Sequence, residues 1–229
     1  MQRFLAVWLG LSILGAGLAI GYGFQQGRSQ DRYVTVKGLA EHAVVADQGT
    51  WILRFQAMAS TLNDATLAHQ SAAKSVWNFV QAMGFDEAEL QRGIPRVQEI
   101  AHHSQQNQVR YQINDDLRIQ TKKVELLQEL AGRSAELLNQ GVVLAGWEEP
   151  QYYFTQLVEI KPKMIEIATQ DARAAARKFA DDVETDLGAI RRASQGYFSF
   201  HGENQGLAEV NQIRKVARVV VTIEFILND

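Results

Sequence analysis

The N-terminal segment constrains this chain more than any other part of it. From Phe4 to Phe24 the sequence runs 21 residues without an ionisable group except the phenol of Tyr22. A helix rises about 1.5 Å per residue, so this segment would span roughly 31 Å, close to the hydrocarbon core of a bilayer. A helix in the core of a soluble protein would show a polar face, and this segment has none. We therefore predict that it enters a membrane.

Two kinds of membrane segment fit this pattern. A cleaved signal peptide would use Arg3 as its positive end and would be cut after the small residues ending at Ala19. An uncleaved anchor is favoured, because the apolar run continues past Ala19 to Phe24. Both alternatives export the chain after Gln25, so they differ only in whether it stays tethered.

Charge and composition exclude several classes of function for the exported part. Residues 1–30 contain Arg3, Arg28 and no acid, so residues 31–229 hold 21 basic and 26 acidic side chains, a net charge of −5. This charge offers no general attraction to phosphate backbones, and we expect no nucleic acid partner. The chain has no cysteine, which excludes a thiol nucleophile, a Cys-ligated zinc and an iron–sulfur cluster.

Alternation of apolar and polar residues is clearest from Val109 to Thr121. The odd positions are apolar up to Ile119, apart from Asp115, and the even positions are polar. Such a strand has one buried and one wet face, as in an antiparallel sheet covered by helices on one side. Asp115 is either a buried functional acid or part of a β-bulge at Asn114-Asp115-Asp116, and the bulge is the simpler interpretation.

Other segments show strand or helix periodicity of the same kind. We predict strands at 33–45, 50–60, 152–160 and 216–227, and helices from Thr61 to Gly84, at 122–138 and at 162–186, where Pro162 opens the third helix. The hydroxyl of Thr61 is expected to cap the first helix. The inner stripe of the third helix is predicted to be Ile165, Ala168, Ala172, Ala175, Phe179 and Val183.

The resulting fold class is α+β, with an antiparallel sheet packed on helices. The predicted order is β-β-α-β-β-α-β-α-β-β, preceded by the N-terminal transmembrane or signal helix. Residues 1–30 form the membrane segment with a short polar linker, and residues 31–229 form one domain, since no break rich in proline, glycine or serine follows Asp31.

Motifs that would carry catalysis or cofactor binding are missing from the sequence. No Gly-x-Gly-x-x-Gly, Walker or Gly-x-Ser-x-Gly pattern occurs. His102-His103 is the best metal candidate, but neighbours on a strand point to opposite faces, and a polar loop is the simpler interpretation. Isolated histidines at 42, 69 and 201 are interpreted as surface or cap residues. We therefore assign no catalytic, cofactor-binding or metal-binding residue and expect no enzymatic activity.

Paired carboxylates and clustered aromatics are weaker candidates for a site. The acid pairs are Asp115-Asp116, Glu148-Glu149 and Asp181-Asp182, the last on a mixed-charge helix face. Catalysis by acid and base would need two carboxyls in one cleft with different pKa values, which spacing alone does not establish. Aromatic residues gather at Tyr152 to Phe154 and at Tyr197, Phe198 and Phe200. Sheet packing explains most of them, although they would also suit a ligand groove or an oligomer contact.

Several stretches resemble the SIMPL-domain family of exported bacterial proteins. Val34-Thr35-Val36-Lys37-Gly38 is similar to the family's opening strand, and Tyr111-Gln112-Ile113-Asn114 to its central segment. Asp171-Ala172-Arg173, followed by Leu187-Gly188, resembles its third-helix signature, and the strand around Arg218 to Thr222 fits its closing strand. Ala46-Asp47 departs from the Pro-Asp that members often carry. The likeness covers about residues 33–227.

This resemblance implies a location and a kind of role. It implies an envelope or periplasmic protein without catalytic residues, in some members assembled into ring-like oligomers and linked to stress. We accordingly expect a single-pass protein of the bacterial inner membrane, with its C-terminal domain in the periplasm, acting as an oligomeric structural or interaction module. The alternatives are a soluble periplasmic form after cleavage, and a protein that binds a small molecule or client through its exposed aromatics.

Overall fold

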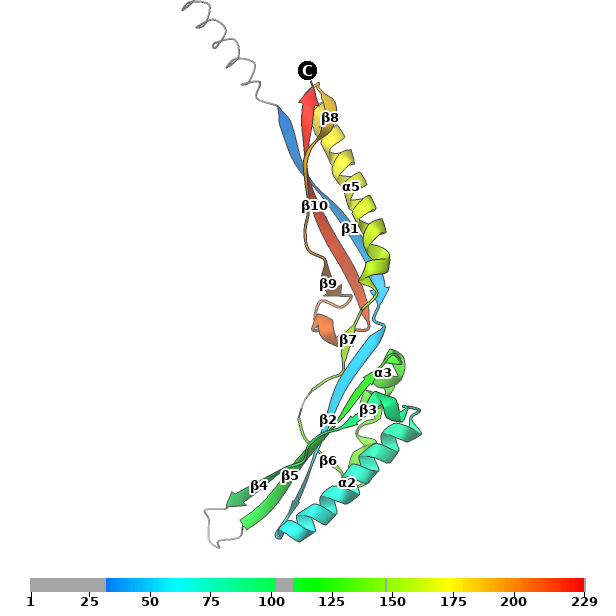
Figure 1. Cartoon of the computed structure of the whole chain (residues 1–229), viewed down its shortest axis with the longest axis vertical. Helices are drawn as coiled ribbons and strands as arrows, with labels where there is room; N and C mark the ends of the chain where they lie inside the picture. Colours follow the sequence, from blue (N-terminus) through cyan, green and yellow to red (C-terminus); the bar gives the residue numbers. More distant parts are fainter. Residues whose placement is uncertain (1–31, 102–108, 147, 229) are drawn as a thin grey trace, which may run out of the picture. The chain divides into compact units, whose positions relative to one another are not determined.

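The structure is a computed structural model that describes residues 32–101, 109–146 and 148–228, so the predicted membrane segment lies outside it. As predicted, the described part is α+β, with antiparallel strand pairing and the helices α2 to α5 (Figure 1). No helix within these ranges is long and apolar enough to cross a membrane.

The helices and strands follow one another without long gaps. In chain order they are β1 (Tyr33–Val45), β2 (Gln48–Ala59), α2 (Leu62–Ala82), η1 (Glu87–Glu89), β3 (Leu90–Arg92), β4 (Arg96–Ala101), β5 (Val109–Thr121), α3 (Val124–Arg133), α4 (Glu136–Asn139), β6 (Val143–Leu144), β7 (Gln151–Tyr153), α5 (Leu157–Asp182), β8 (Asp186–Gln195), β9 (Ser199–Gly202), η2 (Glu209–Asn211) and β10 (Arg214–Asn228).

The larger sheet has the order β3-β5-β2-β6, with β4 also on β5 and β7 on β2. Strands β2 and β5 pair one-to-one from Gly49 opposite Thr121 to Ala59 opposite Tyr111. Helix α2 lies along this sheet (Figure 1), because its apolar stripe packs on the apolar positions of β2 and β5. The central buried side chains of this core are Trp51, Leu53, Phe55, Val76, Val80, Leu117, Ile119, Leu127 and Leu130.

The predicted start of α2 is confirmed. Thr61 precedes the helix with extended backbone, and its hydroxyl oxygen accepts a hydrogen bond from the backbone N–H of Asp64 at 3.1 Å. This bond satisfies one of the N–H groups that the first turn leaves without an intrahelical partner. The strands β1 and β5 also have the predicted bounds.

The second sheet has the order β1-β10-β8, with β9 also paired to β10. Strand β10 alternates as predicted, with Ala217, Val219, Val221, Ile223 and Phe225 buried. The predicted order includes a strand between the third helix and the strand at 216–227, and β8 lies there. Its bounds were not predicted, because most of its side chains are exposed and it carries no alternating apolar pattern.

The predicted inner stripe of α5 is partly wrong. Its buried residues are Met164, Ala168, Ala172, Ala176 and Ala180. Ala168 and Ala172 were predicted, but Phe179 and Val183 are exposed. The small alanines occupy the inner side because the helix backbone approaches β1 so closely that larger side chains do not fit there.

Close approach between α5 and β1 depends on Gly38. A Cβ on Gly38 would lie 2.6 Å from the backbone nitrogen of Ala172 and 2.8 Å from its methyl group. Real Cβ atoms do not approach other atoms this closely, so only glycine fits without a shift of the backbone.

Two further predictions near α5 and α3 are wrong. The predicted strand at 152–160 ends at Tyr153, and α5 begins at Leu157, which places Pro162 inside the helix. Leu157, Ile160 and Met164 follow the helical spacing that the alanines continue, and this packing outweighs the hydrogen bond that proline removes. The predicted helix at 122–138 is two helices, α3 and α4, with the break after Arg133.

The chain forms two compact units. The first comprises residues up to Leu39, Ala168–Gly196 and Val220 onward, and the second comprises Ala40–Ile167 and Tyr197–Val219. Three of the four boundaries fall within β1, α5 and β10, and the fourth follows Gly196, between β8 and β9. All the sites described below lie within one unit or the other.

Candidate functional site

A polar pair lies between α2 and β5, in a region that is otherwise apolar. The imidazole Nε2 of His69 is 2.8 Å from Oδ2 of Asp115, and their side chains are only 13% and 11% exposed. The other oxygen of Asp115, Oδ1, accepts a hydrogen bond from the backbone N–H of Asp116 at 2.8 Å. Both oxygens of this carboxylate are therefore bonded within the protein.

The position of each partner follows from its element. Asp115 shares the inward face of β5 with the buried residues Ile113 and Leu117, as the alternation predicted. His69 lies on the inner side of α2, between Ala65 and Ala72 at helical spacing. The interpretation of His69 as a surface or cap residue is therefore wrong, because tertiary packing places it opposite Asp115.

Phe55 completes the apolar surroundings of the pair. It stands directly opposite Asp115 across the β2–β5 register. Its ring stacks on the His69 imidazole with a centroid distance of 6.0 Å and an interplanar angle of 11°. The stacking and the hydrogen bond together hold the imidazole in one orientation.

A cavity of about 520 Å³ opens beside this pair. We call it the α2–β5 cavity. Its lining residues are Phe55, His69, Gln70, Ala73, Lys74, Val76, Trp77, Asn78, Arg92, Gly93, Pro95, Asp115, Asp116 and Leu117. Its volume lies within the range typical of sites that bind small organic ligands.

The cavity opens where the edge of the sheet is irregular. Arg92 pairs with Leu117 and Arg96 with Asn114, so the three residues 93–95 face the two residues 115–116. The β-bulge predicted at Asn114-Asp115-Asp116 is therefore wrong in its location: β5 is regular against β2, and the extra residue lies in the neighbouring segment. A Cβ on Gly93 would lie 2.6 Å from Cγ of Asp116, so the bulge is made by a residue without a side chain.

Aromatic and cationic groups lie on the other wall of the cavity. The guanidinium carbon of Arg92 lies 4.3 Å from the ring centroid of Trp77, which is a cation–π geometry. Asp116 accepts a hydrogen bond from Nε of Arg118 at 2.9 Å. The two acids of the cavity thus have donors of their own, Asp115 from His69 and Asp116 from Arg118.

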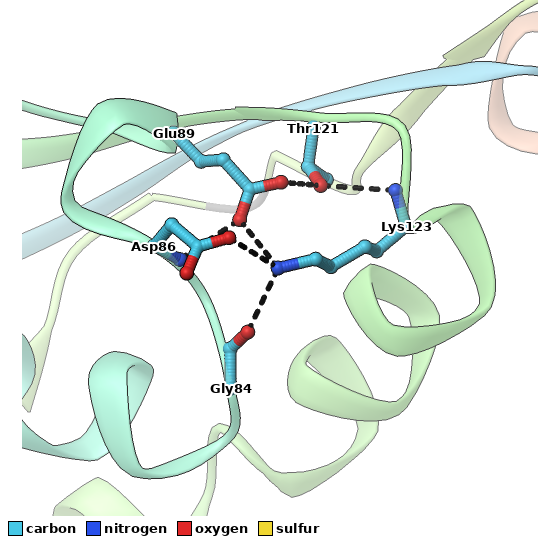
Figure 2. A network of polar contacts seen from close by, with 5 residues as sticks. All are labelled: Gly84, Asp86, Glu89, Thr121 and Lys123. Carbon is cyan, nitrogen blue, oxygen red and sulfur yellow. Dashed lines mark hydrogen bonds and ion pairs between the residues drawn. The ribbon is translucent and has the colours of Figure 1, made fainter.

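A separate network joins the loop after α2 to the start of α3 (Figure 2). The ammonium of Lys123 donates to the carbonyl of Gly84 at 3.0 Å, to Oδ2 of Asp86 at 2.8 Å and to Oε2 of Glu89 at 3.0 Å. Glu89 also accepts from the hydroxyl of Thr121 and from the backbone N–H of Asp86.

Burial alone would raise the pKa of Glu89, but the hydrogen bonds from Thr121, Asp86 and Lys123 outweigh it and lower the pKa below 4.5. The hydrogen bonds to Asp86 and Glu89 raise the pKa of Lys123. These charges are paired with one another, so we interpret the network as a structural clamp.

The other histidines do not form a site with each other. His42 and His201 are exposed, and His201 lies within hydrogen-bonding distance of the Ser199 hydroxyl at 3.1 Å. His102-His103 falls outside the described residues. Within the described ranges, no group of three or more metal-ligating side chains gathers.

The remaining acid pairs do not converge either. Glu148 forms an ion pair with Arg54, and its carbonyl accepts a hydrogen bond from the Trp51 indole at 2.8 Å. Asp181 and Asp182 are exposed at the end of α5, as predicted for a solvated face.

The aromatic residues do not form one surface. Tyr152 is a core residue, and burial followed by the charge of Glu149 raises its pKa to about 12. Phe154 contacts Phe200 with a centroid distance of 6.1 Å. Tyr197 is 98% exposed. Tyr152 is therefore unavailable to a ligand, and the predicted aromatic groove would lack one of its walls.

The hydrogen bond of His69 links two elements that line the α2–β5 cavity. Among the described residues, the hydrogen-bond partner of His69 is Asp115, and no hydroxyl is bonded to the imidazole. A histidine that activates a serine or threonine would need that contact. The His69–Asp115 pair instead joins α2 to β5 and forms a rigid floor for the cavity.

Comparison with known proteins identifies the family. The family model described as "SIMPL: Protein of unknown function (DUF541)" matches residues 34–223. The chain belongs to the SIMPL family. This confirms the resemblance carried by the motifs at 34–38, 111–114 and 171–173. No curated protein matches the chain.

Among solved structures, the chain is similar to one described as the crystal structure of a hydrolase from Listeria innocua. The identity is 13%, the alignment covers 80% of this chain and 91% of that chain, and the TM-score is 0.22. A likeness this weak carries no argument about activity.

Proposed function

We propose that this SIMPL protein is tethered in the bacterial inner membrane, with residues 31–229 in the periplasm, and that it holds partners without catalysing a reaction. The support for the location is the apolar segment from Phe4 to Phe24 and the resemblance to exported proteins. Membrane fractionation with intact-mass measurement tests it. An intact chain in the membrane fraction is expected, a mass lacking the residues up to Ala19 would indicate a cleaved signal, and recovery in the cytoplasm would contradict the proposal.

The proposal includes self-association, and one observation carries it. Phe179 is 56% exposed and Val183 is 53% exposed, although both are large apolar side chains. Phe179 lies in the last turn of α5, and Val183 is the first residue after the helix. The inner side is occupied by Ala172, Ala176 and Ala180, so the pair has no core to enter. Removing such side chains from water favours association.

A second copy of the chain is the partner that the surrounding charges favour. Arg177 and Lys178 precede Phe179, and Asp181 and Asp182 follow it. Two copies of α5 packed antiparallel would place the bases of one opposite the acids of the other, as a two-fold interface requires. Tethering in one membrane would also raise the effective concentration of the copies. A stress link, which the resemblance implies, would then act through assembly.

The mass of the full chain in detergent micelles tests self-association. Sedimentation is expected to give a protein mass of two or more chains, and Phe179→Glu is expected to reduce it to one. Gln81→Glu adds the same charge to the exposed side of α2 and should leave the mass unchanged. A wild-type monomer at high concentration, or an unchanged mass for Phe179→Glu, would contradict the proposal.

A second candidate function is small-molecule binding, favoured by the α2–β5 cavity. The cavity has a stacked aromatic wall and a braced polar floor, whereas the groups around Tyr153 and Phe198 lack one continuous surface. A thermal shift of the full chain across a panel of metabolites tests it. We expect Trp77→Leu to abolish the shift and Tyr153→Ala to retain it; the reverse result would move the site to the exposed aromatics.

The absence of catalysis is also open to test. Purified full chain is expected to show no turnover of ester, amide or phosphate substrates. Turnover that disappears in His69→Gln would establish an enzyme and overturn this part of the proposal.

A further inference from the structure

The charges of the α2–β5 cavity indicate what kind of molecule it would hold. Its acids already have partners: His69 and a backbone N–H satisfy Asp115, and Arg118 bonds to Asp116. A cationic ligand would have to compete with these contacts. Displacing them would leave a donor such as His69 unpaired in a largely buried site, which is costly.

The two cations of the cavity are in the opposite situation. Among the residues that the structure describes, neither Lys74 nor Arg92 forms an ion pair with a carboxylate. Lys74 comes from α2 and Arg92 from the end of β3, so they reach the cavity from two different elements. The charge left for a ligand to neutralise is therefore positive.

The apolar part of the lining favours an organic ligand. Trp77 and Pro95 present apolar surface to the cavity, and the buried side chains Phe55, Val76 and Leu117 lie beneath them. The Arg92 guanidinium already lies over the Trp77 ring, so an anion bound to Arg92 would lie close to that ring. A planar or apolar body beside the anionic group would remove this surface from water, which an inorganic ion would not do.

We infer that the α2–β5 cavity binds a small organic anion, with its charged group on Lys74 and Arg92 and its aromatic or apolar body against Trp77. The exposed amides of Gln70 and Asn78 line the same wall and can donate further hydrogen bonds. This inference rests on the second candidate function, small-molecule binding, and specifies the class of ligand.

Three probes of nearly equal shape test the inference. Full chain in lipid nanodiscs is titrated with benzoate, benzyl alcohol and benzylammonium, and ligand-observed NMR measures binding against empty nanodiscs. Benzoate is expected to bind about tenfold more tightly than benzyl alcohol, since one lost charge-assisted contact is worth at least that factor. Benzylammonium is expected to bind more weakly than benzyl alcohol. Inorganic phosphate is expected to displace benzoate only at much higher concentration.

Variants locate the binding in the cavity. Arg92→Gln and Lys74→Gln are each expected to weaken benzoate binding about tenfold and to leave benzyl alcohol binding within twofold. Lys161→Gln removes an exposed cation of α5 that lies outside both proposed sites and should change neither. The unfolding temperature of each variant shows whether the substitution has disturbed the fold. The side chains of Lys74 and Arg92 are exposed, so we expect this temperature to be unchanged.

Each contrary result removes a defined part of the inference. Equal binding of benzoate and benzyl alcohol, with loss in Trp77→Leu, would keep the cavity as a binding site and overturn the anionic class. Phosphate competing as well as benzoate would overturn the organic class. No binding of any probe at about 10 mM would overturn the inference and the second candidate function together, while leaving the self-association proposal to its own test.

Discussion

The carboxylate of Asp171 accepts a hydrogen bond from the backbone N–H of Leu39 at 2.9 Å, across 132 positions of sequence. Leu39 follows Gly38 in the opening-strand motif, and Asp171 begins the Asp-Ala-Arg motif of α5. The same two segments touch at Gly38 and Ala172. The two family motifs are therefore the two sides of one contact, in which α5 packs on β1 and bonds to a strand N–H.

Gly38→Ala is expected to destabilise the protein strongly. The added methyl group would overlap the α5 backbone, so the helix must move, and we expect a loss of about 3 kcal/mol of unfolding free energy, at the upper end of typical overpacking costs. Urea unfolding of the full chain measures it. Gly132→Ala is the control, since a Cβ there meets nothing within 4 Å and alanine should stabilise α3 slightly. Equal effects of the two substitutions would contradict the packing argument.

Asp171→Asn separates the hydrogen bond from the packing. Asparagine keeps an acceptor oxygen but loses the negative charge, so we expect a loss of less than about 1 kcal/mol, whereas Asp171→Ala should cost about 1 kcal/mol or slightly more. The amide of Leu39 should exchange its hydrogen faster in the alanine variant. Unchanged exchange in both variants would show that the bond contributes nothing.

The His69–Asp115 contact is expected to show measurable coupling. Its partners are largely buried, so a double-mutant cycle with His69→Ala and Asp115→Ala should give a coupling free energy of about 1–2 kcal/mol. The control pair is Asp116 with Arg118, whose arginine side chain is 54% exposed. Exposed pairs contribute little, so the control coupling should stay below about 1 kcal/mol. Equal coupling free energies in the two cycles would contradict the interpretation of the His69–Asp115 contact as a structural link between α2 and β5.

The Glu89 clamp is expected to lose its contribution in acid. Because the Glu89 pKa is lower in the folded chain than the ordinary 4.5, the carboxylate stabilises the fold above that value and loses the effect as pH falls through the folded pKa. Wild type should therefore exceed Glu89→Gln in unfolding temperature at neutral pH, and the gap should narrow below pH 4.5. Thermal melts at several pH values measure it, with Glu125→Gln as an exposed control. If the difference in unfolding temperature between wild type and Glu89→Gln does not change with pH, the ionised Glu89 carboxylate is not the source of that difference.

Lys215 offers a test of a buried cation. Its side chain is 2% exposed, and its ammonium donates to the carbonyl of Glu209 at 2.7 Å and to the carboxylate of the same residue. Glu209→Ala leaves the ammonium with one partner and is expected to cost about 2 kcal/mol, below the range for fully buried pairs because Glu209 is partly exposed. Lys215→Met removes the charge instead and should be nearly neutral. Urea unfolding compares them, and a larger loss in Lys215→Met would contradict this reasoning.

Local patterns predicted the regular parts of the fold. The bounds of β1 and β5, the Thr61 cap and the buried face of β10 all depend on residues within a few positions of one another. The prediction failed at 152–160, where a short apolar run fits both strand and helix spacing. It also gave no bounds for β8, whose exposed side chains give no periodic signal.

The candidate site was only half predictable. Asp115 was recognisable as the one acid on an apolar strand face. Its hydrogen-bond partner could have been sought among the polar residues on the inner side of α2, where His69 lies at helical spacing between Ala65 and Ala72. Nothing local indicated that these two positions face each other, or that the bulge belongs to residues 93–95.

By itself, the sequence determined the apolar segment from Phe4 to Phe24, the α+β class and the membership of the SIMPL family. These depend on composition, on short motifs and on the spacing of apolar residues over a few positions. The tertiary structure decided which side of α5 is buried, that His69 meets Asp115, and that Lys74 and Arg92 line one cavity without an acidic partner among the described residues. Those outcomes depend on which distant surfaces pack together, and packing is determined by the shape of the whole core rather than by neighbours in the chain.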